Sequence, residues 1–181
     1  MKNLTKICIS TSLAASLLAG VASAAAYNLD TANSSVKFSV SHMKLTKVDG
    51  EFKDFSGKID YDGGKLNVLE GSVAIQSIDT ANEKRNAHLN APDMFDSAKH
   101  PYITFKMTDF SGGKIHGDLT IKDTTKHVAF DAKVAENGNK ITIDATGAIN
   151  RSEFGIAWPS VFKDNAVGEE VSIILHLVAS K

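Results

Sequence analysis

The chain has 181 residues, of which 43% are hydrophobic and 23% charged, and its formal net charge at pH 7 is −1. This length is enough for one domain with its own hydrophobic core. The charges are balanced and form no basic cluster, so we expect no nucleic acid among its partners.

Residues 1–24 have the features of a secretory signal. Lys2 and Lys6 come before an apolar stretch over residues 7–21, and the small residues 22–24 follow at the spacing of signal-peptidase sites. Ala26 fits the same cleavage rule, so cleavage after residue 26 is an alternative. We therefore expect one mature domain over residues 25–181, exported to the periplasm or secreted.

The only cysteine, Cys8, lies in this signal, so no disulfide can stabilise the mature domain. Removing Lys2 and Lys6 leaves 18 basic residues against 21 acidic ones, a formal charge of −3. No later apolar run approaches the roughly 20 residues that a membrane-spanning helix needs. We expect at most transient contact with a membrane.

The mature sequence alternates apolar and polar residues in the two-residue period of β-strands. Val36, Phe38, Val40 and His42 share one face of the first clear strand. Turn-forming residues separate the later segments. The predicted strands are residues 35–42, 48–61 (interrupted at Gly50 and Gly57), 66–78, 103–108, 115–121, 128–134, 141–149 and 171–179.

One stretch, residues 76–101, loses this alternation. Residues 82–89 can form two helical turns, with Asp79, Thr80 or Asn82 as the N-cap. A helix this short is not stable alone, so it must lie on another part of the fold. We expect it to cover one end of the sheet.

About eight antiparallel strands with short turns form either a sandwich or a barrel. Small residues in the predicted inward rows, such as Gly117 and Ala145, stand beside large rings such as Phe105. This pattern allows a tunnel for one ligand but also fits a filled core.

Several short segments, in this order and spacing, resemble the YceI-like family over the whole mature chain. They include Tyr27-Asn28-Leu29-Asp30, Ser77-Ile78-Asp79-Thr80, Arg85-x-x-His88-Leu89, Met94-Phe95-Asp96, His100-Pro101-x-Ile103-x-Phe105 and residues 150–156, Asn-Arg-Ser-Glu-Phe-Gly-Ile. The resemblance implies an all-β fold, an extended eight-stranded antiparallel lipocalin-like barrel with the short helical insertion at one mouth. It also implies a periplasmic protein whose apolar tunnel holds a long-chain amphiphile such as a polyisoprenoid, fatty acid or fatty amide, and a homodimer.

The chain departs from the family pattern at two places. The position after Arg85 is usually Asp and here is Asn86, and a His-Ser pair that is common before the first long strand is replaced by Asn33-Ser34. At these two positions the chain therefore has an amide where the family pattern has a carboxylate or an imidazole.

Arg85 and Arg151 are the only arginines, and each could bind an anionic head group or tie a loop to backbone carbonyls. His42 and His88 could meet at one mouth, or be core histidines bonded to the backbone. Together with apolar residues that could line the tunnel, they form the predicted ligand-binding set: Phe38, Val40, His42, Phe52, Phe55, Ile75, Arg85, His88, Leu89, Met94, Phe95, Phe105, Gly117, Phe130, Ala145, Arg151 and Phe154.

No catalytic motif is present: the sequence lacks a nucleophile elbow, a zinc-protease motif and a phosphate-binding loop. The dispersed histidines give no metal-ligand spacing. Together with the family resemblance, this predicts a carrier or store of one lipid, with no other cofactor. The alternatives are an enzyme of isoprenoid, quinone or lipid metabolism with His42 or His88 as its base, or an accessory factor for a membrane redox protein.

Overall fold

The computed structural model describes residues 26–42, 46–158 and 167–181, and for His42 the backbone alone. The predicted signal, residues 1–24, lies outside the described residues. No helix in the described ranges is long and apolar enough to span a bilayer.

The chain forms strands, one α-helix and three short 3-10 helices. Their bounds are β1 Ala26–Leu29, η1 Thr31–Asn33, β2 Ser35–His42, β3 Thr46–Phe52, β4 Phe55–Asp62, β5 Lys65–Ala74, η2 Ile75–Ser77, β6 Ile78–Asp79, α1 Glu83–Asn90, β7 Tyr102–Ser111, β8 Lys114–Ile121, β9 Thr124–Asn137, β10 Lys140–Asn150, η3 Arg151–Phe154 and β11 Val167–Ser180.

The strands close into an antiparallel barrel with eight positions, as predicted. The order is β1-β4-β5-β7-β8-β9-β10-β11-β2-β3-β6, and an additional pairing joins β1 to β11. Both β1 and β2 pair with β11, at Leu29 opposite Ala179 and at Val36 opposite Leu175, so together they fill one position. Strand β3 pairs with β2 and strand β4 pairs with β1, so β3 and β4 together fill the next position of the barrel.

The predicted long strand over residues 48–61 is divided, but not at its glycines. Gly50 and Gly57 stay inside β3 and β4, and the break falls at Lys53 and Asp54. There the backbone bonds to another segment: the Asp54 carbonyl accepts the Ala74 N–H at 2.9 Å. The predicted strand over residues 66–78 is wrong after Ala74, because η2 turns the chain before β6.

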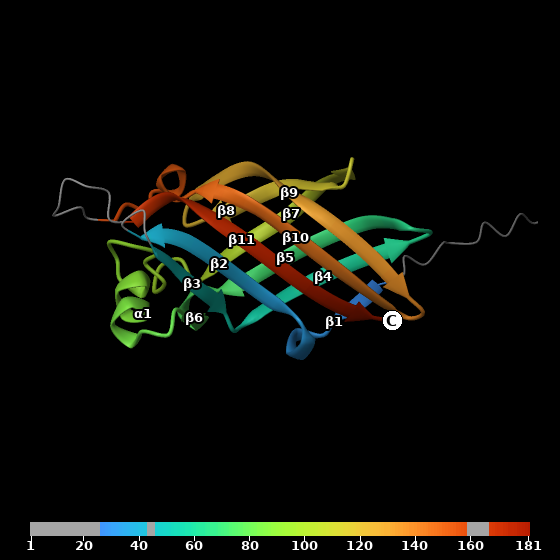
Figure 1. Cartoon of the computed structure of the whole chain (residues 1–181), viewed down its shortest axis with the longest axis horizontal. Coiled ribbons are helices and arrows are strands. Elements are labelled where there is room, and N and C mark those ends of the chain that lie inside the picture. Colours follow the sequence, from blue (N-terminus) through green and yellow to red (C-terminus); the bar gives the residue numbers. More distant parts are fainter. Residues whose placement is uncertain (1–25, 43–45, 159–166) are drawn as a thin grey trace, which may run out of the picture.

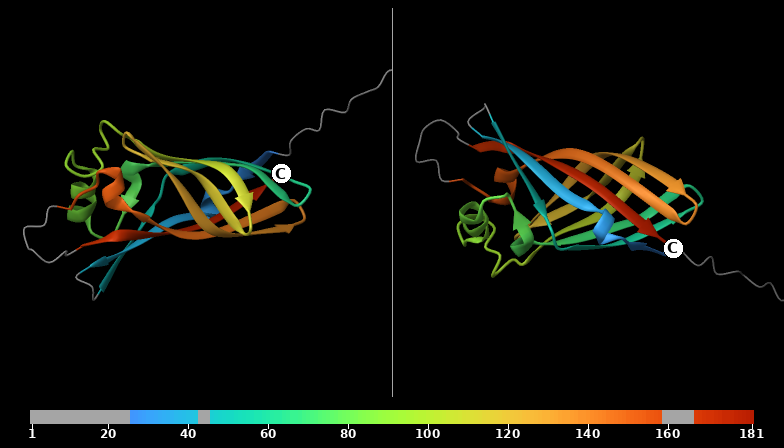
Figure 2. Two further views of the ribbon diagram at one scale, coloured as in Figure 1. Left: turned by 90° about the horizontal axis from the view of Figure 1, so that it is seen from above. Right: turned by 60° about the horizontal axis from the view of Figure 1, so that its bottom comes forward.

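Helix α1 confirms the helical insertion and lies at the end of the barrel opposite the C-terminus (Figure 1). Figure 2 shows the same arrangement from two further sides. Of the three possible caps, Asn82 is the N-cap, and its side chain accepts the Arg85 N–H at 3.0 Å. No residue of α1 is buried, and the helix covers the barrel end with its partly buried Leu89 packed against the core there.

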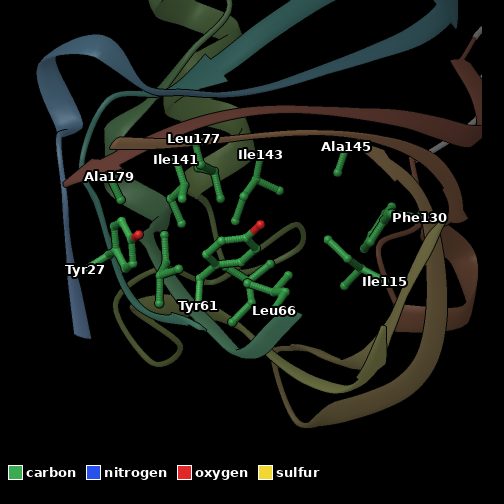
Figure 3. Packing of buried hydrophobic residues seen from close by; sticks show 12 residues of the cluster. Tyr27, Tyr61, Leu66, Ile115, Phe130, Ile141, Ile143, Ala145, Leu177 and Ala179 are labelled. Carbon is green, nitrogen blue, oxygen red and sulfur yellow. The ribbon is translucent and has the colours of Figure 1, made fainter. Parts of the chain in front are cut away.

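The half of the barrel near the C-terminus is filled by side chains. Tyr27 and Tyr61 pack edge to face with ring centroids 6.2 Å apart, and Ile143 is completely buried. Side chains from the ring of strands meet across the interior in Figure 3. This closed-end core consists of Tyr27, Ile59, Tyr61, Leu66, Leu69, Ile115, Phe130, Ile141, Ile143, Ala145, Leu177 and Ala179.

A second, smaller cluster lies at the α1 end. It contains Met94 after the helix, Leu119 and Ile121 at the end of β8, and Phe154 and Ile156 in and after η3. Phe154 and Met94 are each 1% exposed. This cluster fixes the segments around α1 to the barrel, and the space between the two clusters holds the site described next.

Candidate functional site

A cavity of about 500 Å³ occupies the barrel interior between the closed-end core and α1. This volume is in the range of small-molecule binding sites. Its walls are mostly aliphatic and aromatic. They include Val36, Phe38 and Val40 from β2, Val48 and Phe52 from β3, and Val171, Ile173, Leu175 and Leu177 from β11.

Three phenylalanine rings of the wall lie directly over glycines. An ideal Cβ on Gly50 would lie 2.3 Å from Phe38 Cζ. A Cβ on Gly117 would lie 2.4 Å from Phe105 Cζ. A Cβ on Gly147 would lie 2.4 Å from Phe130 Cδ1. These glycines let large rings lie against the wall rather than across the interior, because only a residue without Cβ permits such close approach.

Gly71 is a different kind of glycine. It also lines the cavity, but a Cβ there would meet only the Ser56 carbonyl oxygen, at 3.9 Å. Gly71 is paired with Gly57 on β4 and Phe105 on β7, so all three share the inward face. Gly71 therefore borders open space in the interior.

The polar residues of the lining form two groups. One group, Thr80, Lys84, Arg85, His88 and Arg151, lies at the α1 end. The other is beside the Gly57–Gly71 pair and consists of Ser56, Glu70, Ser72 and Thr104, which also border a groove on the outer face of the sheet. The described residues of the lining between these two groups are apolar.

Arg85 is anchored at the cavity end by Thr80. Its Nε donates to Thr80 Oγ1 at 2.8 Å and its Nη2 donates to the Thr80 carbonyl at 2.6 Å. Asn86 Oδ1 accepts from the Thr80 N–H at 2.9 Å and from its hydroxyl at 2.6 Å. Asn86 thus holds the partner of Arg85 without adding a charge.

The turn before α1 is held by Asp79. Its carboxylate contacts Lys53 Nζ at 2.5 Å and accepts the Ala81 N–H at 2.9 Å. The hydrogen bond from Lys53, followed by those from Ala81 and Asn86, lowers the pKa of Asp79 from 3.8 to about 2. Asp79 is therefore ionised and already paired at neutral pH.

Arg151 uses its guanidinium to tie loops together. Its Nε, Nη1 and Nη2 donate to the carbonyls of Gly168, Ile156 and Val167, at 2.9, 2.7 and 3.0 Å. Burial lowers the pKa of Arg151, while the charge of Glu169 acts in the opposite direction. The sequence allowed Arg151 either to bind an anionic head group or to tie a loop to backbone carbonyls, and the structure shows the second role.

His88 lies on the cavity side of α1 with two neighbours. Its Nε2 is 3.2 Å from Asp93 Oδ2, and its ring centroid is 5.0 Å from that of Trp158. An imidazole held this way borders the cavity mouth. Within the described ranges, no group of three His, Cys, Asp or Glu residues could hold a metal ion.

Twelve residues of the predicted binding set line the cavity, and their part in binding stays a prediction. They are Phe38, Val40, Phe52, Phe55, Arg85, His88, Leu89, Met94, Phe95, Phe105, Phe130 and Arg151.

Four other predicted residues do not line it, and each has a physical reason. Ile75 is 0% exposed in η2, and Phe154 packs in the cluster at the α1 end. Ala145 is 1% exposed in the closed-end core, and Gly117 is covered by the Phe105 ring. His42 ends β2 by its backbone, but its side chain lies outside the described residues.

The predicted set missed Gly71, Lys84 and Trp158, which all line the cavity. Lys84 had a usable signal, since it stands one helical turn before His88 and therefore shares its face. Gly71 and Trp158 had none, because a glycine in a strand or a tryptophan in a connection indicates no particular neighbour.

Comparisons with known proteins agree with the fold. The family model described as YceI-like domain matches residues 27–179. A UPF0312 protein of Staphylococcus epidermidis is 32% identical over 150 residues, covering 78% of this chain and 88% of that protein, and a UPF0312 protein of Staphylococcus aureus is 34% identical with the same coverage.

Among solved structures, BcnA of Burkholderia cenocepacia is similar with a TM-score of 0.77 and 29% identity, covering 84% of this chain and 100% of that one. A polyisoprenoid binding domain from Saccharophagus degradans shares the fold, with a TM-score of 0.70 and 15% identity over 85% of this chain and 97% of that one. On the match to its family model and the similarity to these relatives, the chain belongs to the YceI-like domain family.

Proposed function

We propose that this protein is an exported carrier that holds one long-chain amphiphile, with the tail in the barrel cavity and the head group at the α1 end. One observation carries the proposal: an apolar cavity of about 500 Å³ that ends on a filled core and has cationic and hydrogen-bonding groups at its α1 end. A linear molecule with an apolar tail and one polar end matches that distribution.

The tail would supply most of the affinity. Each buried methylene contributes about 0.8 kcal/mol, so a tail of roughly 15 would contribute ~12 kcal/mol before the costs of association. The closed-end core limits how deep the tail can reach, and the rings of Phe38 and Phe105 leave the interior open by lying against glycines.

Candidates for the tail are a polyisoprenoid chain and a fatty acyl chain. The Saccharophagus domain, which is described as polyisoprenoid binding, supports the first only through the shared fold. We further propose a periplasmic location, from the signal at residues 1–24, and a homodimer, from the family resemblance. Contact with a membrane would be transient.

Native mass spectrometry of the mature protein, purified from its export compartment, tests the carrier function. We expect a mass excess of one lipid per chain that disappears after solvent extraction, and the extract should contain one class of long-chain amphiphile. Identical masses before and after extraction, together with no uptake of added lipid by the extracted protein, would contradict the proposal.

A further inference from the structure

The charged side chains that line the cavity at the α1 end are all cationic. They are Lys84, Arg85 and Arg151, and no Asp or Glu of the described ranges lines that end. The only described acid in the lining is Glu70, on β5, whose carboxylate lies 3.8 Å from Lys106 Nζ. Among the described residues, the α1 end thus carries positive charge that no lining carboxylate offsets.

Helix α1 is oriented so that its cations face the cavity and its acid does not. Lys84 and His88, and Arg85 and Leu89, are pairs four residues apart, which places all four on one side of the helix. All four line the cavity, whereas the exposed Glu83 does not. The orientation of the helix therefore concentrates basic groups at the mouth.

Two of these cations keep unused hydrogen-bonding capacity. Arg85 uses Nε and Nη2 on Thr80, and Nη1 has no hydrogen-bond partner within the described part of the chain. The exposed Lys84 makes no ion pair there either, while the nearby Asp79 is already paired with Lys53. Since Asn86 is neutral, the charge of Arg85 also lacks a carboxylate at the adjacent position.

From this arrangement we infer that the α1 end binds an anionic head group, a carboxylate or a phosphate ester, on Lys84 and Arg85. The inference rests on the proposed carrier function and names the class of amphiphile. Charge-assisted hydrogen bonds from a guanidinium and an ammonium are stronger than neutral ones, and a partly enclosed mouth screens them less than open water does. Arg151 adds its positive charge but has its own donors on three backbone carbonyls.

Four ligands with the same sixteen-carbon tail test this inference: hexadecanoate and hexadecyl phosphate as anions, and hexadecanamide and hexadecanol as neutral analogues. Each is titrated below its aggregation threshold into extracted protein at pH 7.5 and low salt. We expect the anions to bind at least about tenfold more tightly than the neutral pair. The preference should shrink as salt is raised. The anion that binds with the higher affinity then shows whether a carboxylate or a phosphate is the favoured head group.

Lys84→Gln is the informative variant, because this exposed side chain has no described partner whose loss would unfold the protein. We expect it to weaken anion binding at least about threefold and to change the neutral ligands less than about twofold. Lys65→Gln, an exposed lysine in the hairpin at the opposite end, is the matched control and should change neither class. Adding Arg85→Gln to Lys84→Gln should bring the ratio of anion to neutral affinity close to one.

Equal affinities for anions and neutral analogues in the unchanged protein would overturn the inference while leaving the carrier function intact. The same holds if Lys84→Gln weakens both classes equally. Failure of all four ligands to bind, together with identical native masses before and after extraction, would contradict the carrier function itself.

Discussion

The inward side chains of β10 change character along the strand. Ile141 and Ile143, near the C-terminal end of the barrel, are 1% and 0% exposed, whereas Gly147 is covered by a ring and Ile149 lines the cavity. On β11, Ala179 is 0% exposed in the closed-end core, while Val171 lies on the cavity wall. The same strands therefore build a filled half and a hollow half.

The difference comes from what crosses the interior. In the filled half, Tyr27, Tyr61 and Leu66 project inward and meet side chains from the opposite strands (Figure 3). In the hollow half, the tip of the Phe38 ring lies against Gly50. The filled half should therefore contribute most of the stability, and the hollow half should bind the ligand. Substitutions in the filled half should mainly lower stability, and substitutions in the hollow half should mainly change ligand binding.

The largest expected effect is on stability in the filled half. Ile143→Ala removes a fully buried side chain and should lower the free energy of unfolding by about 2–5 kcal/mol. Ile173→Ala, on the cavity wall, should cost less than half as much, because its side chain already borders open space. Urea denaturation of both variants measures this. Equal losses would mean that the two halves are packed alike.

Two glycines of the hollow half should respond differently to alanine. At Gly117 the added Cβ would lie 2.6 Å from the Lys106 carbonyl oxygen as well as against the Phe105 ring, so we expect a loss of roughly 1–3 kcal/mol. At Gly50 its three nearest atoms all belong to the Phe38 ring, which can swing into the cavity. Gly50→Ala should therefore keep stability within about 1 kcal/mol of the unchanged protein and reduce lipid uptake. Normal uptake would show that the Phe38 ring moves elsewhere.

Helix α1 should gain protection from hydrogen exchange when the cavity is occupied. None of its residues is buried, so its stability depends on what lies beneath it. We expect its amides to exchange roughly three- to tenfold more slowly in the lipid-bound protein, with no change for residues 141–145 in the filled half. Equal rates in both states would identify α1 as a fixed cap.

The smallest expected effect is a pH dependence at the turn before α1. The pKa of Asp79 is about 2 in the folded protein against 3.8 ordinarily, so its contribution to stability is complete above pH 4 and is lost as the pH falls toward 2. Asp79→Asn should lose less stability than the unchanged protein over that range in acid titrations followed by circular dichroism. A parallel decline of both proteins would assign acid sensitivity to other groups.

The barrel and α1 could be predicted because their signals are local. Two-residue alternation identifies the inward face of each strand, and Asn82 has the chemistry of an N-cap. The first strand, β1, is only four residues long and was missed as a strand, since its pairing with β4 and β11 depends on residues far away in sequence.

The site was harder to predict, because alternation gives the face of a residue but not what fills the space in front of it. Gly117 and Ala145 were expected to leave room for a ligand, yet Phe105 occupies the first position and the closed-end core surrounds the second. The two arginines look alike in sequence. Only the fold shows that Arg151 bonds three backbone carbonyls while one nitrogen of Arg85 has no partner among the described residues.

Filling the cavity is the most direct test of the claim that a hollow half binds lipid. Gly71→Trp places an indole in the cavity, at a position where a Cβ would meet only the Ser56 carbonyl oxygen, at 3.9 Å. Ser172→Trp is the control, because it places the same group on the exposed face of β11. Lipid stoichiometry is measured by native mass spectrometry beside the urea midpoint of each variant. We expect Gly71→Trp to fold normally with almost no bound lipid and Ser172→Trp to bind one lipid per chain. A folded Gly71→Trp variant that still binds one lipid per chain would contradict the account.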